Sequence, residues 1–105
     1  MQVNNNPHAQ AGWDLFLALV MNSESSGSLT ELFECLLTPE ECESLGLRVS
    51  LIQELLDGSL TQRDISKKLG ISIAKITRGS NALKRITPEL HDRLQSRLCA
   101  NSKKK

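Results

Sequence analysis

Cysteine and histidine are scarce in this sequence, and both shortages exclude a kind of site. Three cysteines in 105 residues, Cys35, Cys42 and Cys99, are too few for the disulfide framework that stabilises a small secreted domain. We interpret them as small apolar residues. The two histidines, His8 and His91, do not stand with cysteines or carboxylates at metal-ligand spacing. The sequence therefore predicts neither structural disulfides nor a metal site.

Catalytic and membrane-targeting motifs are missing as well. The sequence has no Ser–His–acid set and no glycine-rich phosphate loop, so we expect no catalytic residue and no enzyme. No apolar run is long enough to cross a membrane. The asparagine-rich first residues carry no Lys or Arg ahead of an apolar run, as a secretory signal would. A protein of the reducing cytoplasm, without a membrane partner, is the prediction.

Positive charge is nearly absent from the first sixty residues. Residues 1–60 contain one basic residue, Arg48, and nine acidic ones, which gives a net charge of −8. Residues 61–85 carry +6 and residues 86–105 carry +3, so the overall charge of +1 conceals an acidic half and a basic half. A basic half of this kind favours a polyanionic partner such as DNA, although a solvated helical surface has a similar composition.

What the sequence does contain is a series of helix-start signals. Thr38 and Thr87 each precede Pro-Glu, a pattern typical of an N-cap followed by the first helical turn. Alternating strand patterns and hairpin turns are absent. The predicted fold class is all-α, with helices at residues 9–22, 29–36, 39–57, 62–69, 73–85 and 88–99. We expect a flexible N-terminal arm at 1–8, a single helical domain at 9–100 and a basic tail at 101–105.

Two of the expected helices are too apolar for the surface of a small monomer. The 39–57 segment has two apolar stripes, and the 9–22 segment is apolar on all sides. A surface helix needs only one apolar stripe, so both should be covered on more than one side. The six-helix subunit is therefore expected to form an extensive homodimer, with a tight monomeric bundle as the alternative.

Residues 62–85 fit a helix-turn-helix. Isoleucines give each of the two helices an inner face, and Ser66 is small where the helices would cross. Gly70 can supply the positive φ that the short turn needs. Ser72 would then cap the second helix, whose first residues would enter the major groove of DNA.

The segment from Leu36 to Lys84 resembles the bacterial tryptophan repressor family. The resemblance rests on the motifs LLTPEE, LGxRVxxxxELL, LTQRD and ITRGSNALK, which occur in this order and at compatible spacing. It covers about half of the 105-residue chain, and the remainder is similar in helical pattern only. The family fold that it implies is an intertwined all-α homodimer with a helix-turn-helix in each subunit.

The resemblance also implies a site for L-tryptophan as a regulatory corepressor, with no other cofactor. Arg48 of one subunit and Arg78 of the other would flank the indole ring, and Arg78 would pair with the carboxylate. The backbone carbonyls of Cys35 and Leu37, together with Thr38, would receive the ammonium group.

Two further residues of this site are small. Gly79 would leave room for the indole. Ala82 stands where the family has a serine whose hydroxyl lies near the ligand's amino group, so tryptophan binding should be weakened and the choice of ligand is open. The expected corepressor-binding residues are Cys35, Leu37, Thr38, Arg48, Arg78, Gly79 and Ala82.

For DNA, the resemblance implies that Arg63 reaches a guanine edge and Lys84 a phosphate. The family usually has lysine where Ser66 stands and threonine where Lys75 stands, so a positive charge has moved to the second helix. The operator sequence is left open by this change. The expected DNA-binding residues are Gln62, Arg63, Ser66, Ser72, Ile73, Ala74, Lys75, Thr77 and Lys84.

The resulting prediction is a cytoplasmic, homodimeric transcriptional repressor that binds operator double-stranded DNA when L-tryptophan is bound. It would control genes of tryptophan biosynthesis or transport. Two alternatives stay open: a regulator of the same fold that senses another ligand or none, and a dimeric helical adaptor that binds protein through its acidic half.

Overall fold

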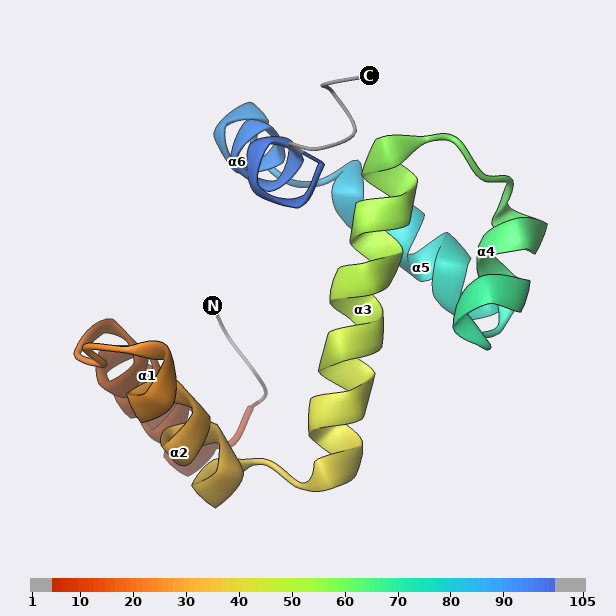
Figure 1. The fold of residues 1–105 in the computed structure, drawn as a ribbon. Coiled ribbons are helices and arrows are strands. Elements are labelled where there is room, and N and C mark those ends of the chain that lie inside the picture. The colour runs from red at the N-terminus through yellow and green to blue at the C-terminus, as the bar shows by residue number, and fades with distance from the viewer. Residues whose placement is uncertain (1–4, 100–105) are drawn as a thin grey trace. The chain divides into compact units, whose positions relative to one another are not determined.

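The computed structural model describes residues 5–99 and shows six α-helices and no strand in that range (Figure 1). They are α1 (Pro7–Met21), α2 (Ser26–Leu36), α3 (Pro39–Asp57), α4 (Gln62–Leu69), α5 (Ile73–Leu83) and α6 (Pro88–Leu98). The all-α class predicted from the sequence is confirmed. The chain divides into an N-terminal unit, residues 1–40, and a C-terminal unit, residues 41–105. The predicted basic tail and residues 1–4 of the predicted arm lie outside the described range.

Side-chain caps explain where the later helices begin. At the start of α4, the Asp64 N–H donates to Thr61 Oγ1 at 3.1 Å and the Thr61 N–H donates to Asp64 Oδ2 at 3.3 Å, which is a capping box. Ser72 and Thr87 cap α5 and α6 with their hydroxyl oxygens. Each cap satisfies a backbone donor that a helix start would otherwise leave without a partner. These signals are local in sequence, so the predicted starts of α4, α5 and α6 are confirmed.

Three helix ends differ from the prediction by two or three residues. The side chain of Asn6 caps α1 with proline directly after it, so α1 begins at Pro7 and not at residue 9. Ser25 caps α2, which therefore begins three residues earlier than the serine-rich composition suggested. The end of α5 tightens, because the Arg85 N–H donates to the Ala82 carbonyl at 3.1 Å, and the helix stops at Leu83.

The core of the C-terminal unit is formed where α3, α4 and α5 meet. Its buried residues are Leu51 on α3, Ile65 on α4, Ile76 on α5 and Ile71 in the turn between α4 and α5. Ile65 and Ile76 are 1% and 0% exposed, which confirms the inner faces predicted for these two helices. Half-buried leucines at 47, 55, 60 and 69 pack around this centre. The apolar contacts hold α4 and α5 against the middle of α3.

The end of α6 is fastened to α3 by polar contacts. The side-chain amide of Gln53 on α3 donates to the Leu98 carbonyl at 2.7 Å. In the other direction, the Cys99 thiol donates to the Gln53 carbonyl, with 3.6 Å between sulfur and oxygen. Cys99 is 2% exposed. Its role here is that of a small buried residue, as the sequence suggested.

In the N-terminal unit, α1 and α2 are joined by aromatic contacts. The rings of Trp13 and Phe16 lie 5.3 Å apart between centroids, and those of Phe16 and Phe33 lie 6.0 Å apart. No residue of α1 or α2 is buried. The Nε1 atom of Trp13 is inaccessible to solvent and has no hydrogen-bond partner within residues 5–99.

Large apolar side chains remain exposed in both units. Met21 is 83% exposed and Leu15 is 67% exposed on α1, and Leu45 and Val49 on α3 are 47% and 48% exposed. These positions belong to the two helices that the sequence marks as too apolar for a small monomer. A single chain therefore leaves uncovered the surface that the predicted dimer would bury. None of the helices in the described range is long and apolar enough to cross a membrane.

Candidate ligand cavity and nucleic-acid interface

The turn between α4 and α5 is built by Ser66 and Gly70. Gly70 has a φ of +67°, in the left-handed region that glycine enters without a steric penalty. The Ser66 hydroxyl donates to the Ile71 carbonyl at 2.6 Å, and the Ser66 carbonyl accepts the Gly70 N–H at 2.9 Å. The sequence predicts Ser66 as a DNA-binding residue, whereas its hydroxyl is occupied inside this turn.

The first turn of α5 presents a mostly exposed surface. The Ser72 hydroxyl oxygen accepts the Lys75 backbone N–H at 3.2 Å, so this predicted DNA-binding residue is also the N-cap. Ile73 is 48% exposed, which is unusual for an isoleucine beside a core. Ala74, Lys75 and Thr77 are exposed too, while Ile76 between them points into the core. The predicted reading residues in the first turns of α5 are therefore open to solvent.

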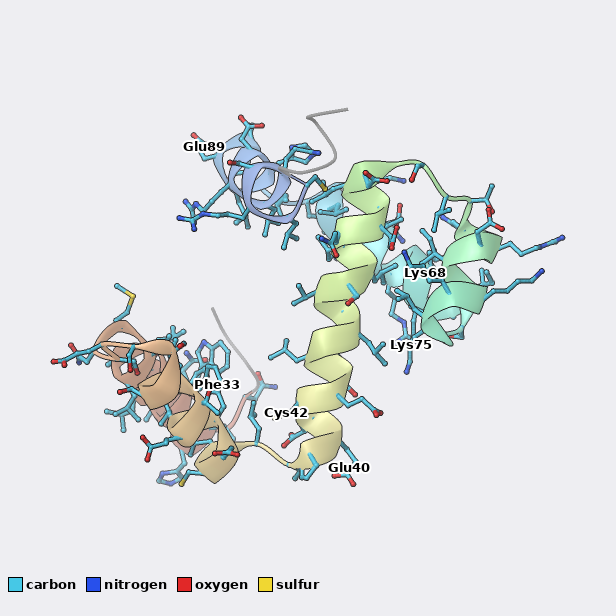
Figure 2. The ribbon with its side chains drawn as sticks, in the orientation of Figure 1. Phe33, Glu40, Cys42, Lys68, Lys75 and Glu89 are labelled. Atoms are coloured by element: carbon cyan, nitrogen blue, oxygen red, sulfur yellow. The ribbon has the colours of Figure 1, made fainter. Side chains whose placement is uncertain are left out.

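Cationic side chains surround this surface. Arg63 on α4 and Lys84 at the end of α5 are exposed, as is the neighbouring Gln62. Lys68 differs from them, because its ammonium pairs with the Glu54 carboxylate on α3 at 2.5 Å. Figure 2 shows the Lys68 side chain between α4 and α3. The outward charge of α4 and α5 is thus positive and available to an anionic partner.

A cavity of about 380 Å³ lies between α3 and α5. Four of the predicted corepressor-binding residues line it: Arg48, Arg78, Gly79 and Ala82. The two arginines come from the same chain here, whereas the sequence assigned them to opposite subunits. They meet because α5 packs across α3 next to the shared core. The complete lining is Ser44, Leu47, Arg48, Leu51, Ile52, Ile71, Lys75, Arg78, Gly79 and Ala82.

Gly79 performs a packing role at this cavity. A β-carbon at position 79 would collide with the side chain of Leu51 on α3. The sequence attributes the need for glycine to the ligand, and the structure shows that the close approach of the two helices also requires it. Because position 79 has no side chain, α5 can approach α3 closely enough to give the cavity this shape.

The remaining predicted ligand residues lie in the N-terminal unit. Cys35 is near the end of α2, and Leu37 and Thr38 form the short link that follows it. None of the three lines the cavity between α3 and α5. The cavity as formed by α3 and α5 holds only the arginine-bearing part of the predicted site.

Sequence reasoning missed several residues of the lining. On α3 these are Ser44, Leu47, Leu51 and Ile52, and on α5 the new one is Lys75, which the sequence assigns to DNA alone. A usable signal existed for most of them, because Ser44, Leu51 and Ile52 stand three or four positions from Arg48, and Lys75 stands three positions from Arg78. Residues at this spacing lie on the same helical face.

Comparison with known proteins gives a consistent result. Residues 11–98 match the family described as Trp repressor protein. A Trp operon repressor homolog of Chlamydia trachomatis serovar D is 42% identical over 89 residues, which is 85% of this chain and 95% of that protein. Homologs with the same description from Aliivibrio fischeri and Pasteurella multocida are 46% and 38% identical over 77 and 92 residues. These alignments cover 73% and 88% of this chain, and 71% and 90% of the two relatives.

Proposed function

Because this chain belongs to the Trp repressor protein family, we propose that it is a DNA-binding transcriptional repressor that responds to L-tryptophan. The family consists of regulators, which agrees with the expectation that the chain is not an enzyme. The observation that carries the proposal is the cavity between α3 and α5. It places Arg78, on the helix whose first turn would read DNA, opposite Arg48 on α3.

The chemistry of the cavity suits the corepressor. The guanidinium groups of Arg48 and Arg78 are planar, so they can stack on an indole ring, and Arg78 can also bind a carboxylate with two parallel N–H groups. Leu47, Leu51 and Ile52 provide an apolar wall for the ring. In the complete site, the carbonyls of Cys35 and Leu37 and the side chain of Thr38 would receive the ammonium group.

The proposed mechanism couples this ligand to DNA through the position of α5. A ligand between α3 and α5 favours the arrangement in which α4 and α5 of two subunits fit successive major grooves. Half-sites read by such dimers lie about 34–36 Å apart. Tryptophan can shift the balance only as far as its affinity for the two arrangements differs.

At the operator, the outward side of α5 would contact base edges and the surrounding cations would contact phosphates. Arg63 is the candidate for a guanine edge and Lys84 for a phosphate. Exposure of these side chains supports this assignment. The other proposed contacts are Gln62, Ser66, Ser72, Ile73, Ala74, Lys75 and Thr77.

The active form proposed here is a homodimer in the cytoplasm, in which both units of the chain belong to one repressor domain. The exposed apolar side chains of α1 and α3 support a dimer, because a second subunit would remove them from water. Genes of tryptophan biosynthesis or transport are the proposed targets.

Ala82 favours a second candidate function, that of a regulator of the same fold that senses a different ligand. Without a hydroxyl at this position, the cavity offers one group fewer to a ligand ammonium. A ligand without an amino group would lose nothing by this change.

The test is operator binding at one fixed salt concentration, with and without L-tryptophan. A palindromic duplex resembling a tryptophan operator is compared with a scrambled duplex of the same composition. Tighter binding to the palindrome when tryptophan is present supports the proposal. Specific binding that ignores tryptophan supports the second candidate, and equal binding to both duplexes rejects a sequence-specific repressor that reads this operator.

A further inference from the structure

Three cationic side chains and no acidic side chain line the cavity between α3 and α5. The cations are Arg48, Lys75 and Arg78. No ion pair connects any of them to another residue in the part of the chain that the structure describes. Three like charges around one cavity repel each other unless an anion lies among them. The proposed corepressor contacts use both arginines and leave Lys75 without a role at the ligand.

Lys75 lies where positive potential is already high. It belongs to the first turn of α5, where its backbone N–H is bonded to the Ser72 cap (Figure 2). The N-terminus of a helix carries a partial positive charge. Arg78 follows three residues later, so both side chains share one face of α5. An anionic group at this end of the cavity would meet the ammonium, the guanidinium and the helix terminus together.

The rest of the lining limits the body of such an anion. Leu47, Leu51, Ile52 and Ile71 are apolar, and Ser44 is the one uncharged polar side chain of the lining. A ligand that fits therefore has an apolar body and a negatively charged end.

We propose that Lys75 is a further specificity-determining residue of this cavity, which selects ligands with a carboxylate over neutral ligands of the same shape. The inference rests on the proposed function in so far as the site is the same. It extends that function by assigning to the ligand a side chain that motif comparison assigns to DNA. Lys75 provides a mobile point charge, whereas the arginines provide planar surfaces.

The competing role for Lys75 is a contact with a DNA phosphate. The two roles have different signatures. Loss of one phosphate contact makes the negative slope of log affinity against log salt less steep by about 0.9, and it leaves ligand selectivity unchanged. Loss of a carboxylate contact weakens binding of charged ligands to the free protein, in which no DNA is present.

The experiment is titration calorimetry of the full-length protein without DNA. The probes are L-tryptophan and L-tryptophanamide, and indole-3-propionate and indole-3-propionamide, so each carboxylate has a neutral counterpart. Lys75→Gln is compared with Lys75→Arg, which keeps the charge, and with Lys67→Gln, which removes a lysine that does not line the cavity. Circular dichroism verifies that each variant is folded.

The expected result is that Lys75→Gln reduces the preference for carboxylate over carboxamide by about two- to fivefold, as for a partly exposed charge pair. Lys75→Arg and Lys67→Gln retain the preference. Unchanged preference in Lys75→Gln overturns the inference, and it leaves the proposed function intact if tryptophan still binds. Lys75-dependent binding of indole-3-propionate without binding of tryptophan supports the inference and rejects tryptophan as corepressor. If none of the four probes binds the parent protein, both the inference on Lys75 and the proposed function are overturned.

Discussion

Gly79 on α5 and Leu51 on α3 approach so closely that a β-carbon at position 79 would lie 2.7 Å from Cδ2 of Leu51. Leu51 is 3% exposed and belongs to the core, so its side chain has little freedom to move away. The contact fixes the separation of the two helices at the cavity. A residue interpreted from the sequence as space for a ligand is thus equally a requirement of the folded protein.

The first prediction concerns this contact. Gly79→Ala should lower the free energy of unfolding by about 1–2 kcal/mol, because overpacking of a core outweighs the better helix propensity of alanine. In a Leu51→Ala background the same change should raise it by about 0.5–1 kcal/mol, since the obstacle is gone. Chemical unfolding at one fixed chain concentration measures both values. Gly46→Ala is the control, because a β-carbon there meets nothing within 4 Å. Equal effects of Gly79→Ala in the two backgrounds would contradict the packing role.

The second prediction concerns the arginine assigned to the carboxylate. Arg78→Ala should reduce tryptophan affinity about 10- to 150-fold, the range for loss of a charge-assisted hydrogen bond. Operator affinity should then no longer depend on tryptophan. Calorimetry and operator binding with and without ligand give the two readouts. Arg93→Ala removes a guanidinium on α6, away from the cavity lining, and should have no effect on ligand affinity. A full tryptophan response in Arg78→Ala would refute the site.

The third prediction restores a hydroxyl at position 82. Ala82→Ser should tighten tryptophan binding by about two- to tenfold, because one neutral hydrogen bond contributes about 0.5–1.5 kcal/mol. Indole-3-propionate has no amino group, so its affinity should not change. The comparison of these two ligands by calorimetry separates a hydrogen bond to the ammonium from a general change in the cavity. An equal gain for both ligands would show that the hydroxyl does not act on the ammonium.

The fourth prediction distinguishes two roles of Ser66. Ser66→Ala removes the hydroxyl that donates to the Ile71 carbonyl, and it should lower the free energy of unfolding by about 0.5–1.5 kcal/mol. Discrimination between operator and scrambled DNA should be unchanged if the hydroxyl acts only in the turn. Unfolding curves and competition binding measure the two effects. A loss of discrimination without a loss of stability would return Ser66 to the DNA interface.

The helices were predictable from the sequence because their signals are local. Thr61, Ser72 and Thr87 act within three residues of their own positions, and each marks a helix start correctly. The starts of α1 and α2 were predicted two and three residues too late, because Asn6 and Ser25 were not recognised as the caps of these helices.

The lining of the cavity was only partly predictable, because it depends on how two helices separated in sequence cross. Motif comparison found Arg48, Arg78, Gly79 and Ala82, and placed the arginines in different subunits. It assigned Lys75 to DNA because of its place on the reading helix, although its spacing of three residues from Arg78 places both on one helical face. Its side chain reaches the cavity because α5 lies across α3, and this depends on the glycine contact with Leu51.

The burial of Cys99 makes its thiol a probe of local opening at the end of α6. A thiol reagent can reach this sulfur only after the end of α6 has separated from Gln53, so the rate of alkylation measures how often that separation occurs. Cys35 and Cys42 are exposed in the same chain and provide an unprotected reference for the reagent. Any condition that stabilises the contact of α6 with α3 will lower the rate of alkylation at Cys99 and leave the rates at Cys35 and Cys42 unchanged.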